Sequence, residues 1–214
     1  MEKEIIVNPY KIESTSMDII ETLLPPLDVT PEEKKIVKRV VHTTGDPEFA
    51  KLLRFHPKAV ESGLAALKKG CHIYSDVTMI KAGVNKRKLS ALGGDIECLI
   101  ATDEIKAEAA KLGITRAMLS MRKLGKKLDG NIVAVGNAPT ALFELRDMIE
   151  RGEVKPALVV GVPVGFVGAA ESKEVFAKLD TPYIVNVGTR GGSTIAVSII
   201  NALIYLLSES EKFA

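Results

Sequence analysis

Tryptophan is absent from the 214 residues, and cysteine, aromatic side chains and net charge are all scarce. The two cysteines, Cys71 and Cys98, form neither a CxxC pair nor a disulfide framework, which is typical of a reducing compartment and predicts a cytoplasmic protein. A net charge of +2 gives no global field to attract nucleic acid or an anionic membrane. An anionic ligand must therefore be held by individual arginine and lysine side chains.

Long hydrophobic runs are also missing. The longest, from Ile195 to Leu207, is interrupted by Ser198 and Asn201 and falls short of the roughly 20 residues that a bilayer-spanning helix needs. The first four residues carry acidic charge and no apolar core of a signal peptide. We therefore expect no membrane partner and no secretion, and we interpret the run as a buried or subunit-interface helix.

The common ligand-binding fingerprints are absent as well. The spacing Gly161-x3-Gly165-x2-Gly168 differs from the dinucleotide pattern GxGxxG, and no GxxxxGK[ST] occurs. The three histidines have no metal-ligand spacing, and no Ser-His-Asp or Cys-His pattern can be read. The sequence therefore predicts no protein-bound metal and no standard nucleotide site.

Short apolar runs alternate with helical stretches through the last two thirds of the chain. The runs that predict strands are 72–75, 95–101, 132–135, 157–160 and 183–187. Helical stretches follow near 103–112, 115–125, 139–151, 168–179 and 190–208. This alternation predicts one doubly wound α/β domain over residues 1–214, with a mainly parallel sheet of about five strands and helices on both faces.

The N-terminal portion is expected to be helical. A first helix ends near Pro25-Pro26, and the next begins with a capping box in which Thr30 is the cap, Pro31 is the first helical residue and Glu33 lies three residues on. Two more helical starts follow, at 46–47 and at 56–57, and the last of these helices closes at Gly70.

Two glycine-marked segments, 136–143 and 161–173, directly follow predicted strands. They therefore lie at the carboxyl edge of the sheet, where open α/β sheets bind ligands. No charged residue occurs from Gly161 to Ala170, so this surface suits a large flat organic ligand better than a phosphate. Gly136, Asn137, Gly165 and Gly168 are the candidate contacts. Tight strand-to-helix turns without a ligand explain the spacing equally well.

His42 is the candidate acid. On the predicted helix from Pro31, Arg39 and His42 lie about 60° apart, on the flank away from the apolar stripe, so they can act on one ligand. His42 also lies at the helix C-terminus, where the macrodipole favours a cation. A solvated histidine at a helix end remains the alternative interpretation.

Two arginines have positions that favour carboxylate binding, which the planar guanidinium suits. Arg116 follows Thr115 at the start of a predicted helix, and Arg190 lies in a glycine-rich turn between the last strand and the last helix.

Taken together, these residues resemble the precorrin-8X / cobalt-precorrin-8 methylmutase family of corrin biosynthesis, from about Tyr10 to Asn201. The motifs that carry the resemblance are 40–42 (VVH), 113–116 (GITR), 136–142 (GNAPTAL), 161–173 (GVPVGFVGAAESK) and 190–193 (RGGS). The family's reaction moves a methyl group from C-11 to C-12 of the corrin macrocycle, without a separate methyl donor.

The resemblance implies roles for particular residues. His42 corresponds to the proton donor and acceptor, while Arg39 and Ser16 correspond to substrate contacts, with Ser14 close by as the other serine for that role. Arg116 and Arg190 become carboxylate partners by their positions. The implied protein is a homodimer that binds a tetrapyrrole and needs no cofactor, since any cobalt belongs to the substrate.

Two other functions stay open from the sequence. One is a non-catalytic carrier that passes a corrinoid to a later enzyme. The other is an unrelated α/β enzyme that uses a nucleotide or S-adenosylmethionine, although the phosphate and acidic ribose motifs it requires are not found.

Overall fold

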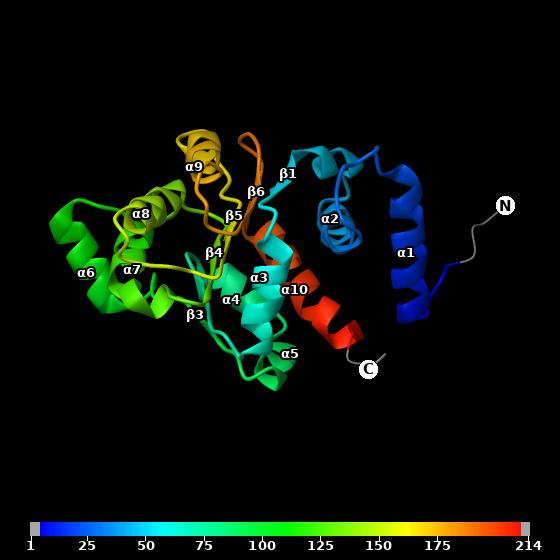
Figure 1. Ribbon diagram of the computed structural model, residues 1–214, viewed down its shortest axis with the longest axis horizontal. Coiled ribbons are helices and arrows are strands. Elements are labelled where there is room, and N and C mark those ends of the chain that lie inside the picture. Colours follow the sequence, from blue (N-terminus) through cyan, green and yellow to red (C-terminus); the bar gives the residue numbers. More distant parts are fainter. Residues whose placement is uncertain (1–4, 211–214) are drawn as a thin grey trace.

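The computed structural model describes residues 5–210 and consists of a helical N-terminal part followed by alternating strands and helices (Figure 1). The N-terminal part contains helices α1 (Pro9–Leu23) and α2 (Pro31–Thr44), the 3-10 helix η1 (Pro47–Leu52), strand β1 (Leu53–Phe55) and helix α3 (Ala59–Lys68). The next elements are β2 (Ile73–Ser75), α4 (Thr78–Gly83), α5 (Lys86–Ala91), β3 (Ile96–Glu97), α6 (Asp103–Leu112), α7 (Arg116–Leu124) and η2 (Gly125–Leu128). The chain then forms β4 (Ile132–Val135), α8 (Pro139–Glu150), β5 (Leu158–Gly161), α9 (Ala169–Phe176), β6 (Tyr183–Asn186) and α10 (Ser193–Ser210).

The strands form one six-stranded sheet in the order β1-β6-β5-β4-β2-β3. Every neighbouring pair is parallel except β1 and β6, where Leu53 lies opposite Asn186 in an antiparallel edge. The order runs outward in both directions from β2 and β4, so the sheet is doubly wound and its ligand-binding crevice is expected outside the carboxyl ends of those two strands.

Alternate residues of the central strands supply two separate cores. Ile132 and Ala134 belong to one core, which packs against α2, α3, α4 and α10, whereas Val133 and Val135 belong to the other, which packs against α7, α8 and α9. Successive side chains of a strand point to opposite faces, so a strand that is apolar throughout needs helices on both sides. The predicted α/β fold with helices on both faces is therefore confirmed.

Three details differ from the sequence prediction. The sheet has six strands instead of about five, since the sequence did not predict β1. Strand β1 contains only three residues and pairs with β6 at the edge of the sheet. Strand β3 is shorter than the predicted 95–101, since it too is an edge strand and pairs along two residues. Helices α4 and α5 were not predicted, because each contains only six residues and is too short to show the periodic spacing of apolar residues that indicates a helix.

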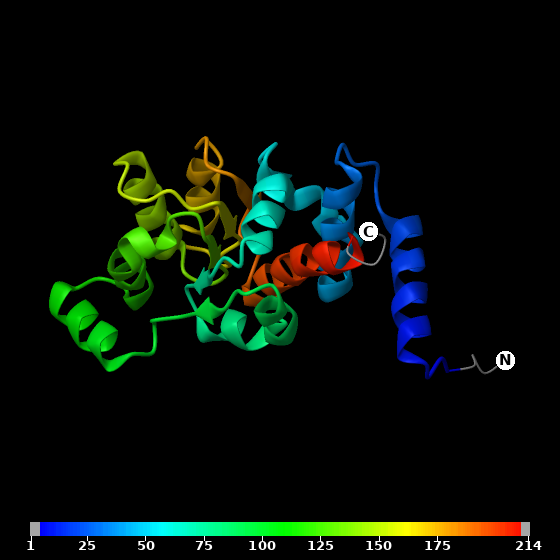
Figure 2. The same ribbon diagram turned by 60° about the horizontal axis from the view of Figure 1, so that its bottom comes forward.

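Helices α1 and α2 lie at one end of the molecule, and α6, α7 and α8 lie at the other (Figures 1 and 2). Helix α10 crosses the middle and packs most extensively against α2. Helix α1 is attached more loosely, because Ile20 is its only buried residue, while Tyr10, Ile12, Ile19 and Leu23 are exposed. Within residues 5–210, no helix is long and apolar enough to cross a membrane.

Candidate active site

Helix α2 positions the two residues that the sequence singled out most strongly. The Thr30 side chain accepts from the Glu33 backbone, and Glu33 in turn accepts from the Thr30 N–H, so the predicted capping box is present. Gly45 ends the helix in the left-handed conformation at φ 64°. The apolar side chains of the helix are buried against the core, and Arg39 and His42 lie on the opposite flank. The buried residues are Ile36, Val37, Val40 and Val41.

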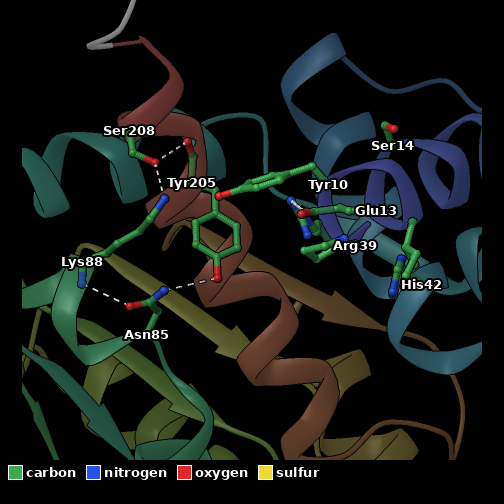
Figure 3. A pocket seen from close by; sticks show the side chains of 11 residues that line it. Tyr10, Glu13, Ser14, Arg39, His42, Asn85, Lys88, Tyr205 and Ser208 are labelled. Atoms are coloured by element: carbon green, nitrogen blue, oxygen red, sulfur yellow. Dashed lines mark hydrogen bonds and ion pairs between the residues drawn. The ribbon is translucent and has the colours of Figure 1, made fainter. Parts of the chain in front are cut away.

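Arg39 and His42 both line a cavity of about 930 Å³, the main cavity, which lies between α1, α2, α5 and α10 (Figure 3). The side chains drawn around it come from segments far apart in the sequence. The lining residues are Pro9, Tyr10, Ile12, Glu13, Ser14, Arg39, His42, Asn85, Lys88, Tyr205 and Ser208.

Two further hollows meet the first one at His42. One has a volume of about 470 Å³, includes Arg39, and has a mostly apolar wall along α4 and α10. The other, of about 260 Å³, lies between α1 and the C-terminal end of α2. His42 thus faces a continuous, partly apolar surface large enough for an extended organic ligand.

The His42 imidazole is exposed, and no other side chain between residues 5 and 208 forms a hydrogen bond or ion pair with it. It lies in the last turn of α2, where the helix carries its partial negative charge. A histidine that lines a cavity and whose imidazole has no side-chain hydrogen-bond partner can exchange a proton with a ligand.

Arg39, by contrast, already has partners. Its guanidinium forms an ion pair with Glu13 of α1 at 2.6 Å and lies over the Tyr205 ring, 5.0 Å from the ring centroid. These two contacts hold the guanidinium between Glu13 of α1 and Tyr205 of α10, on the wall of the main cavity (Figure 3). A ligand carboxylate must share this group with Glu13 or replace it.

The two candidate serines of α1 lie on different sides of His42. Ser14 lines the main cavity and its hydroxyl donates to the Lys11 carbonyl at 3.2 Å. Ser16 lines the smallest of the three hollows, together with His42. Both are within the surface that a ligand at His42 would cover, so the choice between them stays open.

Gly136 and Asn137 lie at the point where the sheet changes winding direction, and their backbone N–H groups are already bonded. Asp76, which follows β2, accepts hydrogen bonds from the N–H groups of 136–138 at 2.9, 2.9 and 2.7 Å. Burial raises the pKa of the Asp76 carboxyl, although the three N–H donors act in the opposite direction. The backbone N–H groups that could bind a phosphate at this point of the fold are therefore already bonded to the Asp76 carboxylate.

Gly136 also permits close packing beneath the second hollow. A Cβ atom there would lie 2.8 Å from the Ser193 Cα, at the start of α10. The next residue, Thr194, lines the hollow that His42 and Arg39 share. Gly136 is buried, so it supports this wall from behind.

Gly165 and Gly168 belong to the loop between β5 and α9. Gly165 donates its N–H to the Thr189 carbonyl at 3.0 Å, and Gly168 caps α9 at φ 77°. Between them, Phe166 and Val167 are 93% and 90% exposed. The loop therefore presents an apolar surface to solvent, and none of its residues lines the cavities at His42.

Arg190 lies near the C-terminal end of α2. Its guanidinium forms an ion pair with Asp46 and stands 4.8 Å from the centroid of the Phe49 ring. Arg116 starts α7, in the helical layer on the other face of the sheet, and is exposed. Within one chain the fold thus brings together His42, Arg39 and the two serines, but it leaves Arg116 at the far end.

Of the residues that line the main cavity, the sequence predicted only Ser14, Arg39 and His42 as contacts; the polar side chains that it missed include Glu13, Asn85, Lys88 and Tyr205. They are contributed by α1, α5 and α10, and no motif connects these helices. The only available signal was the presence of Tyr205 and Ser208 at the polar end of an otherwise apolar last helix. Within the described part of the chain, no group of three or more His, Cys, Asp or Glu side chains is arranged to hold a metal ion.

A sequence model of the family described as precorrin-8X methylmutase matches residues 11–206. The chain belongs to the precorrin-8X methylmutase family. The family's reaction is a methyl migration within one molecule, so the chain is an isomerase of cobalamin biosynthesis. The family resemblance found in the sequence is confirmed, over almost the whole range in which it was seen.

Individual relatives cover most of the chain. A cobalt-precorrin-8 methylmutase of Priestia megaterium is 46% identical over 201 residues, which are 94% of this chain and 89% of that protein. A protein of the same name from Leptospira interrogans is 42% identical over 206 residues, covering 92% and 94% of the two chains. The solved structure of precorrin-8x methyl mutase from Thermus thermophilus superimposes with a TM-score of 0.88 at 39% identity, over 94% of this chain and 97% of that one.

Proposed function

We propose that this methylmutase moves the methyl group from C-11 to C-12 of a precorrin-8 macrocycle bound over the end of α2, with His42 as proton donor and acceptor. The observation that carries the proposal is the position of the His42 imidazole. It has no side-chain partner within residues 5–208, and it lies where three hollows join.

The proposed chemistry needs a proton and a fixed geometry. Protonation of the macrocycle by the imidazolium polarises its π-system, the C-11–methyl bond breaks as the C-12–methyl bond forms, and the proton returns to His42. No atom is gained or lost overall, so no methyl donor or protein-bound cofactor is needed. A positioned acid contributes typically ~10²–10⁴-fold, and holding the methyl group next to its destination contributes further.

The surface around His42 suits a flat ring that carries acidic side chains. The apolar wall of the second hollow, which includes Met79 of α4 and Val197 of α10, can contact the ring. Arg39 can bind an acetate or propionate group at the rim of the ring. Ser14 or Ser16 would supply a hydroxyl on the α1 side. Any cobalt is carried by the macrocycle.

We further propose a homodimer in which two copies complete each site. Arg116, Gly165 and Gly168 lie outside the cavities at His42 in the same chain, so they can serve that site only from a second copy. The exposed Phe166 and Val167 give this loop an apolar surface of the kind that subunit interfaces bury. A cytoplasmic location and a single functional domain also remain part of this proposal.

A spectral assay tests the proposal. The protein is mixed in excess with metal-free precorrin-8 and, separately, with its cobalt complex, and the visible spectrum is followed. Conversion of either spectrum to that of hydrogenobyrinate or cobyrinate supports the methylmutase, and the faster substrate identifies the natural one. Binding without any spectral change would instead support the corrinoid carrier.

A further inference from the structure

The main cavity contains a second cation that the family resemblance did not assign. Lys88, on α5, has its Nζ atom 4.5 Å from the centroid of the Tyr205 ring, and Arg39 stands over the same ring. Figure 3 shows the two cationic side chains on either side of Tyr205, with His42 beyond Arg39. The cavity is therefore lined by cations on both sides of one aromatic side chain.

The two cations differ in what compensates their charge. The Arg39 guanidinium is paired with the carboxylate of Glu13. Lys88 has a neutral partner, because its Nζ bonds the Ser208 hydroxyl at 3.0 Å, and no carboxylate of the described side chains lies within 4.0 Å of it. Glu13 is the only acidic side chain that lines the cavity within the described residues. Among the described side chains, the Lys88 ammonium group thus faces the cavity without a counter-charge.

The position of Lys88 is fixed by contacts with α10. Asn85 caps α5 by accepting from the Lys88 N–H at 3.2 Å, and its own N–H donates to the Asn201 side chain at 2.8 Å. The Asn85 amide also reaches the Tyr205 hydroxyl at 3.4 Å. Because the helix start and the ammonium group are both held by α10, little freedom remains to be lost when an anion binds.

We propose that Lys88 binds a carboxylate of the corrinoid, across Tyr205 from the carboxylate that Arg39 binds. This inference rests on the proposed function. The macrocycle carries acetate and propionate groups around its rim, and an ammonium–carboxylate contact in a partly buried cavity is stronger than one in open water. The Glu13–Arg39 pair already shows that the cavity accepts a carboxylate beside Tyr205.

The experiment compares Lys88→Met with Lys88→Arg and Lys86→Met. Methionine keeps most of the length of the side chain and removes its charge, whereas arginine keeps the charge. Lys86 is exposed, lies two residues away on the same helix, and lines none of the cavities at His42, so Lys86→Met is a matched control for net charge. Binding of cobyrinate is measured by spectral titration at low and at high salt, together with kcat and KM for the methyl migration.

We expect Lys88→Met to weaken binding roughly tenfold, to raise KM correspondingly and to leave kcat within about twofold. Its affinity should also depend less on salt, because one screened ion pair is lost. Lys88→Arg should retain most of the affinity, and Lys86→Met should match the wild type.

A Kd for Lys88→Met within about twofold of wild type would overturn the inference. Equal weakening by Lys86→Met would do the same, because it would indicate a general charge effect. Failure of the proposed function has a different signature: the wild type would bind cobyrinate but would not convert precorrin-8. In that case the spectral titration with cobyrinate would still show whether Lys88 contributes to binding.

Discussion

At the scale of single residues, the contacts of Arg39 decide how a carboxylate can enter the cavity. Its guanidinium is shared between Glu13 and the Tyr205 ring. Glu13 is about half exposed and comes from α1, the most loosely packed helix of this region. An exposed ion pair of this kind contributes only about 0–1 kcal/mol, so a substrate carboxylate can displace Glu13 at small cost.

The first prediction concerns this pair. Arg39→Ala should raise KM roughly tenfold or more, with a smaller effect on kcat, because a charged hydrogen bond to the substrate is lost. Glu13→Gln should lower KM by about two- to fivefold, because the competing charge is removed. Steady-state kinetics measures both. Unchanged affinity in Arg39→Ala would argue against a carboxylate contact, and a raised KM in Glu13→Gln would mean that Glu13 orients Arg39 instead.

At the scale of secondary-structure elements, a buried lysine joins the two loops that follow β5 and β6. Lys173 of α9 is 1% exposed, and its Nζ lies 3.0 Å from the Pro163 carbonyl, 2.7 Å from the Arg190 carbonyl and 3.4 Å from the Asn186 side-chain oxygen. Three acceptors thus surround the three protons of an ammonium group. The contact holds the apolar loop and the Arg190 turn in one arrangement.

The second prediction follows from the charge of this lysine. Burial lowers the pKa of Lys173 from 10.5 to about 8. Between these values the unfolded chain holds a proton that the folded chain has released, so the free energy of unfolding rises with pH across this window, by about 3 kcal/mol over its full width. Lys173→Met removes this contribution.

Denaturant unfolding at pH 7.5 and at pH 10 tests the second prediction. The difference in unfolding free energy between the wild type and Lys173→Met should move in favour of the wild type as the pH rises. The same difference at both pH values would mean that the folded pKa is not lowered. Other groups titrate in both proteins and cancel in the comparison.

The elements also show which parts of the site the sequence could predict. Helix α2 was predicted correctly because its cap, its first proline and its apolar stripe are all local signals, and they place Arg39 and His42 on one flank. The Asp76 contact with the turn at Gly136 could not be predicted, because it joins residues about 60 positions apart through the parallel pairing of β2 and β4. The same is true of Lys88 and Tyr205, which meet only after α5 packs on α10.

At the scale of the whole molecule, the predicted site residues are divided between two ends. His42 and Arg39 lie with α1 and α2, whereas Arg116 lies with α7 and α8 (Figure 1). Two copies related by a two-fold axis would bring the opposite ends together in two equivalent sites. The proposed dimer would in this way unite candidate residues that one chain keeps apart.

The third prediction tests this division by subunit complementation. His42→Ala and Arg116→Ala should each have low kcat/KM alone. In a mixed dimer, one site combines both substitutions and the other has neither, so random mixing should restore activity in about a quarter of the sites. The measurement is activity after the two variants are unfolded and refolded together, with each variant refolded alone as the control. No recovery in a sample shown to contain mixed dimers would contradict a shared site.

The central claim, that His42 supplies the proton for methyl migration, is tested most directly by a single-turnover spectrum of His42→Ala. His72→Ala removes an exposed histidine that lines none of the cavities at His42 and is the matched control. We predict that His42→Ala binds precorrin-8 with nearly wild-type affinity but converts it at least ~10²-fold more slowly, while His72→Ala converts it normally. Conversion by His42→Ala at the wild-type rate would contradict the account.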